Sequence, residues 1–204
     1  MYVPNHFNHE DASAALAFMQ RFNFATLVSL VDNAPFASHL PFIIEERAGQ
    51  IWLSVHMAKN NPQGQNLADQ QSLTIFSEPH AYVSPSLYEK EQNVPTWNYI
   101  AIHAYGRARL IDDETASFRL LEKQIQTYEA AYAEQWQKLS EGYKNAMIKG
   151  IVSFEIPVEK LESKWKLSQN KSEKDQETVA RHLENSQDTS ERTIAAYMRQ
   201  LQKP

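Results

Sequence analysis

The spacing of apolar residues changes along the first part of the chain from a helical to an alternating pattern. Residues Asp11–Phe22 are rich in alanine and carry apolar side chains at helical spacing, which predicts a helix. Two runs rich in β-branched and aromatic residues follow, Phe24–Val31 and Phe36–Ile44, and the turn-forming residues Asp32–Pro35 between them predict a hairpin. In Gln50–His56 apolar residues alternate with others, which is typical of a half-buried strand.

The middle of the chain mixes helix and strand signals. Asn61 as a cap and Pro62 in the first turn predict a short helix that ends near Asp69. Acidic residues from Asp112 onward begin a helical pattern that persists, with breaks, to Met147. The remaining strand signals are Ser72–Phe76, His80–Ser84, Thr96–Tyr105 with a continuation to Ile111, and Ile151–Ile156.

The order of these elements indicates the class of fold. Many consecutive strands without alternating helices favour an antiparallel sheet or barrel with flanking helices over a parallel α/β arrangement. The composition becomes polar after Asn170, where Ser172 and Asp175 resemble a capping box and Asn185–Asp188 separate two helical stretches. We therefore expect a barrel domain in residues 1–170 and a helical tail in residues 171–204, packed on the barrel or on a dimer.

The composition excludes several classes of site. The chain has 204 residues, 0 cysteines and a net charge of -5, so disulfides, iron–sulfur clusters and thiol catalysis are excluded. Its 5 glycines are too far apart for the glycine-rich nucleotide-binding motifs. The first residues lack the pattern of a signal peptide, and no apolar run approaches the roughly 18 residues that span a bilayer. We expect a cytoplasmic protein with no membrane partner.

The 7 histidines contain no local chelating motif. His39, His56, His80 and His103 lie on expected strands or at their ends, where they can converge. Ordinary hydrogen-bonded histidines are nevertheless the favoured interpretation, and we expect no metal site.

Two stretches favour a ligand more than the rest of the sequence does. His56–Gln63 runs from a strand into an expected helix N-terminus, whose free N–H groups, with Lys59 alongside, suit a phosphate. Val94–Tyr99 carries Trp97 and Tyr99 beside an amide, which can face a ring system, although a core or interface role is the usual one for such residues.

Six segments, taken in order, resemble PaiB-type regulators. They extend over about residues 1–183, and together they are far more specific than any one of them. The segments are Met1–Phe7, Ala37–Phe42, His56–Pro62, Tyr82–Pro85, Val94–Tyr99 and Lys164–Asn170.

The resemblance implies a split β-barrel of the FMN-binding, pyridoxamine 5'-phosphate oxidase-like kind, in a homodimer with flavin at its interface. It also implies a negative transcriptional regulator of sporulation and protease genes, a label that describes a phenotype and not a chemistry. By position in the family, the FMN site contains Ser38, His39, Leu40, His56, Met57, Ala58, Lys59, Asn61 and Gln63 of one subunit. The other subunit contributes Trp97, Asn98, Lys166, Ser168, Gln169 and Asn170.

Two alternatives stay open beside a flavin-linked regulator. One is an FMN-dependent oxidoreductase that acts on a small molecule. The other is a repressor that binds DNA through the two helical stretches of the tail, which have the outline of a helix-turn-helix. Charge does not support DNA binding, because the basic and acidic side chains of the tail balance. These are Lys171, Lys174, Arg181, Arg192, Arg199 and Lys203 against Glu173, Asp175, Glu177, Glu184, Asp188 and Glu191.

Overall fold

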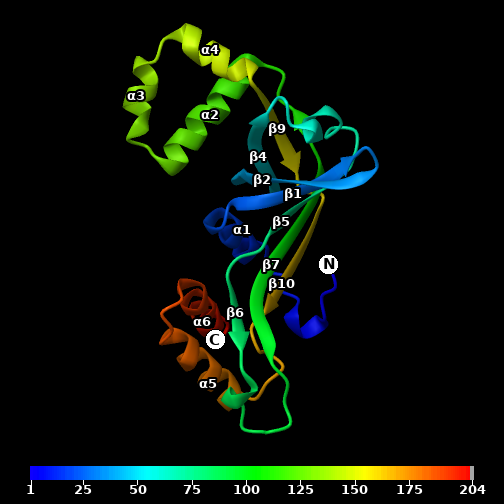
Figure 1. The fold of residues 1–204 in the computed structure, drawn as a ribbon, viewed down its shortest axis with the longest axis vertical. Coiled ribbons are helices and arrows are strands. Elements are labelled where there is room, and N and C mark those ends of the chain that lie inside the picture. Colours follow the sequence, from blue (N-terminus) through cyan, green and yellow to red (C-terminus); the bar gives the residue numbers. More distant parts are fainter. Residues whose placement is uncertain (203–204) are drawn as a thin grey trace. The chain divides into compact units, whose positions relative to one another are not determined.

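The computed structural model describes residues 1–202, so the last two residues of the expected tail, Lys203 among them, lie outside the described residues. By its internal contacts the chain divides into two compact units (Figure 1). The larger unit contains residues 13–76 and 103–161, and the smaller unit contains residues 1–12, 77–102 and the segment from Glu162 onward. Each unit is thus assembled from separate stretches of sequence, and the expected division at residue 170 stays a prediction.

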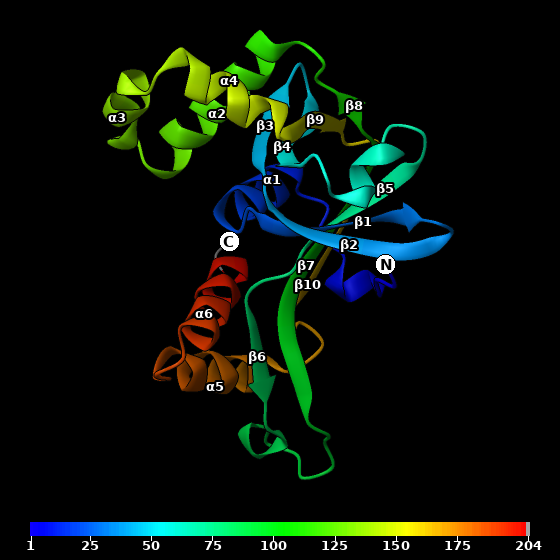
Figure 2. The ribbon, with the colours of Figure 1, turned by 45° about the horizontal axis from the view of Figure 1, so that its top comes forward.

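The first sheet of the larger unit is built around the predicted hairpin. It contains β1 (Phe24–Val31), β2 (Ala34–Pro41), β5 (Gln71–Phe76) and the end of β7 (Thr96–Arg107), in the order β7-β5-β1-β2. Figure 2 shows β1 and β2 lying side by side as two curved strands. Only Asp32 and Asn33 form the turn, with φ of 52° and 61°. A two-residue hairpin turn needs such positive φ values, which Asp and Asn tolerate better than most residues.

The second sheet of the larger unit contains β3 (Ile43–Arg47), β4 (Gln50–Ala58), β9 (Ile151–Pro157) and β8 (Arg109–Leu110), in the order β3-β4-β9-β8. The chain passes from the first sheet into the second where β2 is followed by β3 and where β7 is followed by β8. The predicted strand Phe36–Ile44 is in fact two, because the chain changes sheets at the buried Phe42, whose N–H donates to Asn23 O at 2.9 Å. The predicted continuation to Ile111 is likewise interrupted, at Ala108. The exchange of strands between the two sheets confirms the predicted antiparallel split β-barrel.

Helices flank the sheets of the larger unit. The predicted helix near the N-terminus is confirmed, and the helical pattern that ends at Met147 is resolved into three helices. Asp113 accepts from Thr115 N and Ala116 N, and Ser140 accepts from Tyr143 N, so side-chain caps begin the first and the last of the three. The helices are α1 (Ala12–Arg21), α2 (Glu114–Tyr128), α3 (Tyr132–Lys138) and α4 (Glu141–Lys149).

The predicted short helix after β4 is only a 3-10 turn, η2 (Pro62–Gln65). Asn61 caps it as expected, but the turn does not continue to Asp69. Gly64 and Asn66, which are weak helix formers, lie where the helix would continue.

In the smaller unit, β6 (His80–Val83) and β10 (Lys160–Lys166) both pair with β7. The sequence analysis did not identify β10. Leu161 and Trp165 alternate with charged residues there, but Lys and Glu are uncommon in strands, and the burial of Ser163 and Lys164 depends on the segments that pack over them. Two short 3-10 turns complete the backbone before the tail, η1 (Asn5–Phe7) and η3 (Pro85–Leu87).

The tail forms the two predicted helices, α5 (Glu173–Glu184) and α6 (Thr189–Leu201). Ser172 Oγ accepts from Asp175 N at 3.1 Å, which is the expected capping contact. The start of α6 is fixed to β6, because Ser190 Oγ accepts from His80 N at 2.8 Å and donates to His80 O at 2.7 Å. Ile194 and Met198 are buried, so α6 is part of the core of the smaller unit.

Candidate functional site

The residues predicted to bind the cofactor form two groups, one in each unit. In the larger unit, Ser38, His39 and Leu40 lie on β2, His56, Met57 and Ala58 lie at the end of β4, and Lys59, Asn61 and Gln63 follow in the turn and η2. In the smaller unit, Trp97 and Asn98 lie near the start of β7, Lys166 ends β10, and Ser168, Gln169 and Asn170 lie in the loop before α5.

In the larger unit, Asn61 joins β2 to the turn after β4. Its Nδ2 donates to Ser38 Oγ at 2.8 Å, and its Oδ1 accepts from Gln63 N at 3.0 Å. The structure therefore brings Ser38 and Asn61 together, as the cofactor prediction requires. The side chain of Asn61 already performs a structural task, because it caps η2.

Gln63 has a structural role that sequence reasoning missed. Its side chain is fully buried, and Nε2 donates to Leu27 O at 3.1 Å and to Ser29 Oγ at 2.9 Å. These bonds tie η2 to β1. Gln63 supports the candidate site from within the barrel, because its amide group is directed to the backbone of β1.

His56 supplies a neutral side chain to this group. Burial lowers the pKa of His56, a hydrogen bond from the imidazole to Gln124 opposes that change, and Nδ1 is buried without a hydrogen-bond partner among the described residues. His39 is exposed, and its Nδ1 lies 3.0 Å from Thr26 Oγ1. Lys59 is exposed and is the one Lys or Arg in the group. Leu40 and Met57 are buried and contribute packing.

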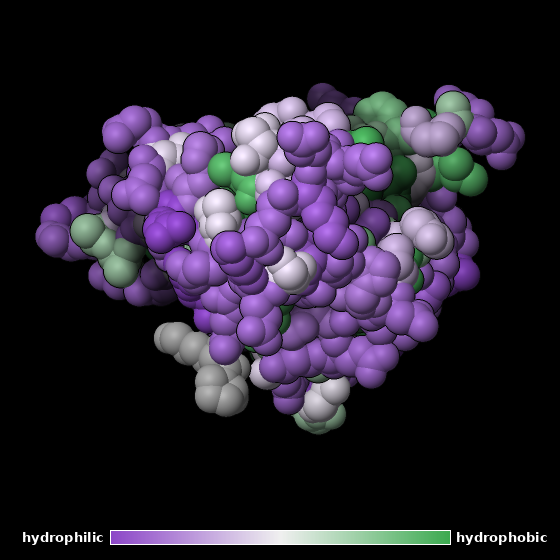
Figure 3. Space-filling model, turned by 90° about the horizontal axis from the view of Figure 1, so that it is seen from below, coloured by the Kyte–Doolittle hydropathy of each residue, from purple (hydrophilic) through white to green (hydrophobic). Residues whose placement is uncertain are grey.

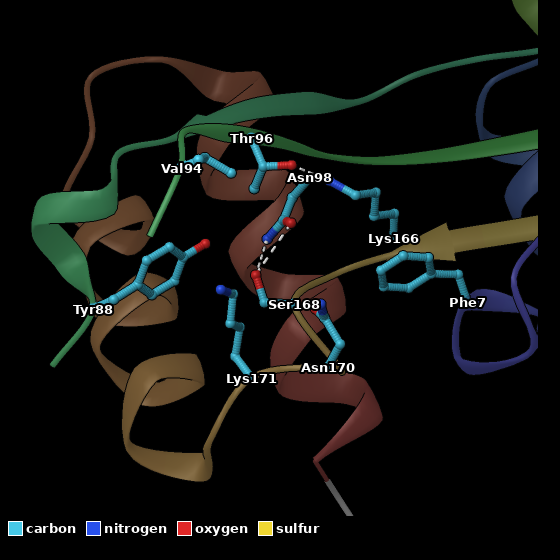
Figure 4. A pocket seen from close by; sticks show the side chains of 9 residues that line it. All are labelled: Phe7, Tyr88, Val94, Thr96, Asn98, Lys166, Ser168, Asn170 and Lys171. Atoms are coloured by element: carbon cyan, nitrogen blue, oxygen red, sulfur yellow. Dashed lines mark hydrogen bonds between the residues drawn. The ribbon is translucent and has the colours of Figure 1, made fainter. Parts of the chain in front are cut away.

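The smaller unit contains a cavity of about 170 Å³ beside the second group (Figure 4). Asn98, which is 1% exposed, lies in its wall and donates to Ser168 Oγ at 2.9 Å. Ser168 has a φ of 68°, in the left-handed region that few non-glycine residues adopt. The lining residues are Phe7, Tyr88, Val94, Thr96, Asn98, Lys166, Ser168, Asn170 and Lys171.

Lys166 is held at the wall of this cavity by neutral oxygen atoms. Its ammonium donates to Thr96 Oγ1 and to Trp97 O. Burial lowers the pKa of Lys166, and the positive charges of Lys164 and Lys171 lower it further. An anion in the cavity would relieve both effects, because it would compensate the partly desolvated charge.

Of the predicted residues of the second group, Trp97 and Gln169 do not line the cavity. The backbone O of Trp97 accepts from Lys166, but the residue is 51% exposed. Gln169 accepts from Leu167 N and donates to Trp165 O at the end of β10. Sequence reasoning missed Tyr88 and Lys171, which do line the cavity. The only signal for Tyr88 was its place in a proline-marked loop, and Lys171 had none.

Among residues 1–202, no group of three or more His, Cys, Asp or Glu side chains is placed to hold a metal ion. Within the same described part of the chain, no helix is both long and apolar enough to cross a bilayer.

Comparison with known proteins identifies relatives over almost the whole chain. Residues 1–160 match the family model described as "Putative FMN-binding domain". The chain is 36% identical over 202 residues to the "Protease synthase and sporulation protein PAI 2" of Bacillus subtilis, and the match covers 97% of this chain and 96% of that protein.

Solved structures with low sequence identity share the fold. The flavocytochrome Anf3 of Azotobacter vinelandii has a TM-score of 0.64 at 16% identity, over 80% of this chain and 72% of that one. The FAD and heme binding protein of Mycobacterium smegmatis has a TM-score of 0.61 at 12% identity, over 78% of this chain and 73% of that one.

Proposed function

We propose that this chain, which belongs to the family whose model describes an FMN-binding domain, is a PaiB-like protein that binds FMN and acts as a flavin-linked homodimer. The observation that carries the proposal is the family match over residues 1–160, together with 36% identity to the Bacillus subtilis relative over 97% of the chain. A bound flavin would supply one- and two-electron redox chemistry, while the protein supplies binding, orientation and electrostatics.

The larger-unit group offers polar atoms for the phosphate of the flavin. Lys59 supplies a positive charge, and Ser38 and His39 supply a hydroxyl and an imidazole on the adjacent strand β2. His56 is neutral because burial lowers its pKa, so it can donate or accept a hydrogen bond but adds no charge. This set is less cationic than a phosphate site with several Arg or Lys residues, and we expect a modest affinity from it.

A homodimer is supported by aromatic side chains exposed on β6 and β7. Tyr82 and Trp97 face each other in the strand register, and their ring centroids lie 5.7 Å apart. They are 45% and 51% exposed. The face drawn in Figure 3 is mainly hydrophilic. Aromatic residues are enriched in the buried centres of protein interfaces. We propose that this strand pair contacts a second copy, which then contributes the smaller-unit group to the flavin site.

The regulatory role that the resemblance implies is assigned here to the flavin-bound dimer and not to a DNA-reading tail. Arg199, the most favourable candidate for a phosphate contact in α6, is paired with both Glu177 and Glu184. Arg192 donates to Ser186 O at 2.7 Å and to Thr189 Oγ1 at 3.0 Å. With these contacts made, the tail has little free positive charge for a DNA backbone.

Titration of flavin into the purified protein tests the proposal. We expect FMN to bind saturably, with the shifted absorption bands and quenched fluorescence of a protein-bound flavin, and riboflavin to bind more weakly because it lacks the phosphate. FAD serves as the comparison ligand, because its extended diphosphate separates FMN preference from general flavin binding. Flavin spectra that stay unchanged up to about 1 mM protein would refute the proposal. Such a result would mean that the binding free energy is weaker than about 4 kcal/mol.

A further inference from the structure

The cavity of the smaller unit is lined by positively charged residues and by no carboxylate, although Asp175 lies close enough to act on Tyr88. Lys166 and Lys171 line the cavity, and no Asp or Glu is among its lining residues. Lys171 Nζ donates to Asn93 Oδ1 at 2.6 Å and lies 4.2 Å from the centroid of the Tyr88 ring. Both ammonium groups therefore rest on neutral partners, which compensate a buried charge less well than a carboxylate does.

A third lysine, Lys164, adds to the positive potential. It is 9% exposed, donates to Tyr2 O at 3.1 Å, and lies 5.4 Å from the centroid of the Tyr99 ring. Within residues 1–202, none of these three lysines forms an ion pair with an Asp or Glu. Three cations concentrated in one unit of a chain with a net charge of -5 indicate an anionic ligand.

Tyr88 provides an independent sign that the cavity is incomplete. The residue is 8% exposed, and its hydroxyl is buried without a hydrogen-bond partner among the described residues. Figure 4 shows this hydroxyl and the Lys171 ammonium directed toward Asn98 and Ser168. A buried hydroxyl without a partner costs about 1–3 kcal/mol. A ligand oxygen in the cavity would remove that cost.

The hydroxyl of Tyr88 is held in its donating form. Burial raises the pKa of Tyr88, and the negative charge of Asp175 raises it further. Ser168 opposes this rise from nearby, but no hydrogen bond of normal geometry joins the two hydroxyl groups. At neutral pH the phenol therefore keeps its proton and can donate it to an acceptor in the cavity.

We propose that this cavity binds a small oxyanion group, a carboxylate or a phosphate monoester, through the ammonium groups of Lys166 and Lys171 and the hydroxyl of Tyr88. At about 170 Å³ it is smaller than the 300–1,000 Å³ pockets of drug-sized ligands, so it accepts a small anion or the charged end of a larger molecule. The inference goes beyond the proposed function, because it requires no flavin. Two sources of the group are compatible with it: the phosphate of a flavin, or a separate anionic metabolite.

Calorimetric titration of inorganic phosphate and acetate into the flavin-free protein, in a low-chloride buffer, tests the site. Saturable binding of at least one anion is expected. Lys171→Met retains the aliphatic stem over Tyr88 and should weaken binding at least tenfold, about 1.4 kcal/mol. Tyr88→Phe removes only the hydroxyl and should weaken it about threefold or more, since one hydrogen bond to a charged group is lost.

Matched controls change the same kinds of residue outside the cavity. Lys149→Met removes an exposed lysine on α4, and Tyr143→Phe removes the hydroxyl of a tyrosine on the same helix that is 51% exposed. Both should bind the anions as the unaltered protein does. No saturable binding up to about 10 mM, or equal losses in Lys171→Met and Lys149→Met, would overturn the proposal.

A crystal structure of the unaltered protein grown in phosphate gives a readout that depends on no variant. The expected result is phosphate bound to Tyr88 Oη and Lys171 Nζ, and an empty cavity at saturating phosphate would contradict the proposal.

A comparison of FMN with riboflavin then separates the two sources of the anion. A loss of affinity in Lys171→Met for FMN alone assigns the site to the flavin phosphate, and undiminished phosphate binding to the FMN-loaded protein assigns it to a separate anion. If flavin fails to bind at all, the phosphate titration still decides this inference on its own.

Discussion

Lys59 and Lys166 are both predicted to contact the cofactor, yet their surroundings differ. Lys59 is exposed, so its attraction for an anion is weakened by water and salt. Lys166 is half-buried, and its ammonium is held by Thr96 Oγ1 and Trp97 O. A change of Lys59 therefore affects an anion without disturbing the fold, and it is the cleaner test of the larger-unit group.

Lys59→Glu should weaken FMN binding at least tenfold, about 1.4 kcal/mol, because it places a negative charge where the phosphate is expected. Riboflavin, which has no phosphate, should bind to the variant and to the unaltered protein equally well. Lys90→Glu makes the same charge change at an exposed loop residue and is the control. Fluorescence titration measures both, and an equal loss in the two variants would remove Lys59 from the site.

His56 makes the stability of the protein depend on pH. Burial lowers the pKa of His56 in the folded protein below the ordinary value of 6.5, so the unfolded chain binds the proton more readily. Above the pKa that His56 has in the unfolded chain, this residue does not lower the free energy of unfolding. As the pH falls below that pKa, the free energy of unfolding decreases by at most about 1.4 kcal/mol per pH unit.

The free energy of unfolding, measured with urea between pH 8 and pH 5, should therefore decrease toward pH 5. His56→Gln should show a smaller decrease, because glutamine does not titrate. A residual slope is expected from His9, whose pKa is also lowered by burial. Identical slopes for the variant and the unaltered protein would show that His56 does not contribute.

At the scale of elements, the barrel depends on a close approach between β7 and β9. A Cβ atom at Gly106 would lie 2.3 Å from Pro157 O and 2.6 Å from Ile156 Cγ2. The first of these atoms belongs to the backbone of the neighbouring segment and cannot move aside as a flexible side chain can. Glycine is therefore required there by space and not by its conformational freedom.

Gly106→Ala should destabilise the protein by about 1–3 kcal/mol or more, because it overpacks the junction. Gly142→Ala is the matched control. Nothing lies within 4 Å of a Cβ at Gly142 in α4, and alanine is the better helix former there by about 1 kcal/mol. Urea unfolding should therefore show opposite signs for the two variants. Two changes of the same sign and size would contradict the packing argument.

At the scale of the whole molecule, the proposed homodimer makes the flavin site complete only when two copies meet. Sedimentation at micromolar concentration should give the mass of a dimer. Trp97→Ala should weaken the dimer by about 2 kcal/mol, roughly thirtyfold, if Trp97 is a central interface residue. Tyr143 on α4 is also 51% exposed, and Tyr143→Ala should leave the dimer unchanged. A monomer mass for the unaltered protein would refute the dimer.

We also expect the whole molecule to bind DNA weakly. The chain has a net charge of -5, and the Arg199 guanidinium is already paired with two carboxylates. Shift assays with genomic fragments at about 0.15 M salt should show only weak binding without sequence preference. Arg192→Ala is the variant to compare, because removal of α6 would expose the buried Ile194 and Met198. Nanomolar, sequence-specific binding that Arg192→Ala abolishes would make a repressor the better assignment.

The sequence alone determined most elements, because their signals are local. The β-branched and aromatic residues of Phe24–Val31 predicted β1, the Asp and Asn residues at the turn predicted the hairpin, and Ser172 predicted the start of α5. It failed at β10, where the polar residues Ser163 and Lys164 are buried, and at Phe42, where one extended segment contributes to two sheets. In each case the missing information is which neighbours cover the segment.

The candidate site divides in the same way. The turn from His56 to Gln63 is continuous in sequence, so its cap at Asn61 could be predicted, but the direction of the Gln63 side chain could not. The cavity that Tyr88 and Lys171 line was decided only by tertiary structure. Its residues come from separate segments, and neither their burial nor the unpartnered Tyr88 hydroxyl follows from local pattern. Packing between distant segments alone sets which polar atoms lose water and which find a partner.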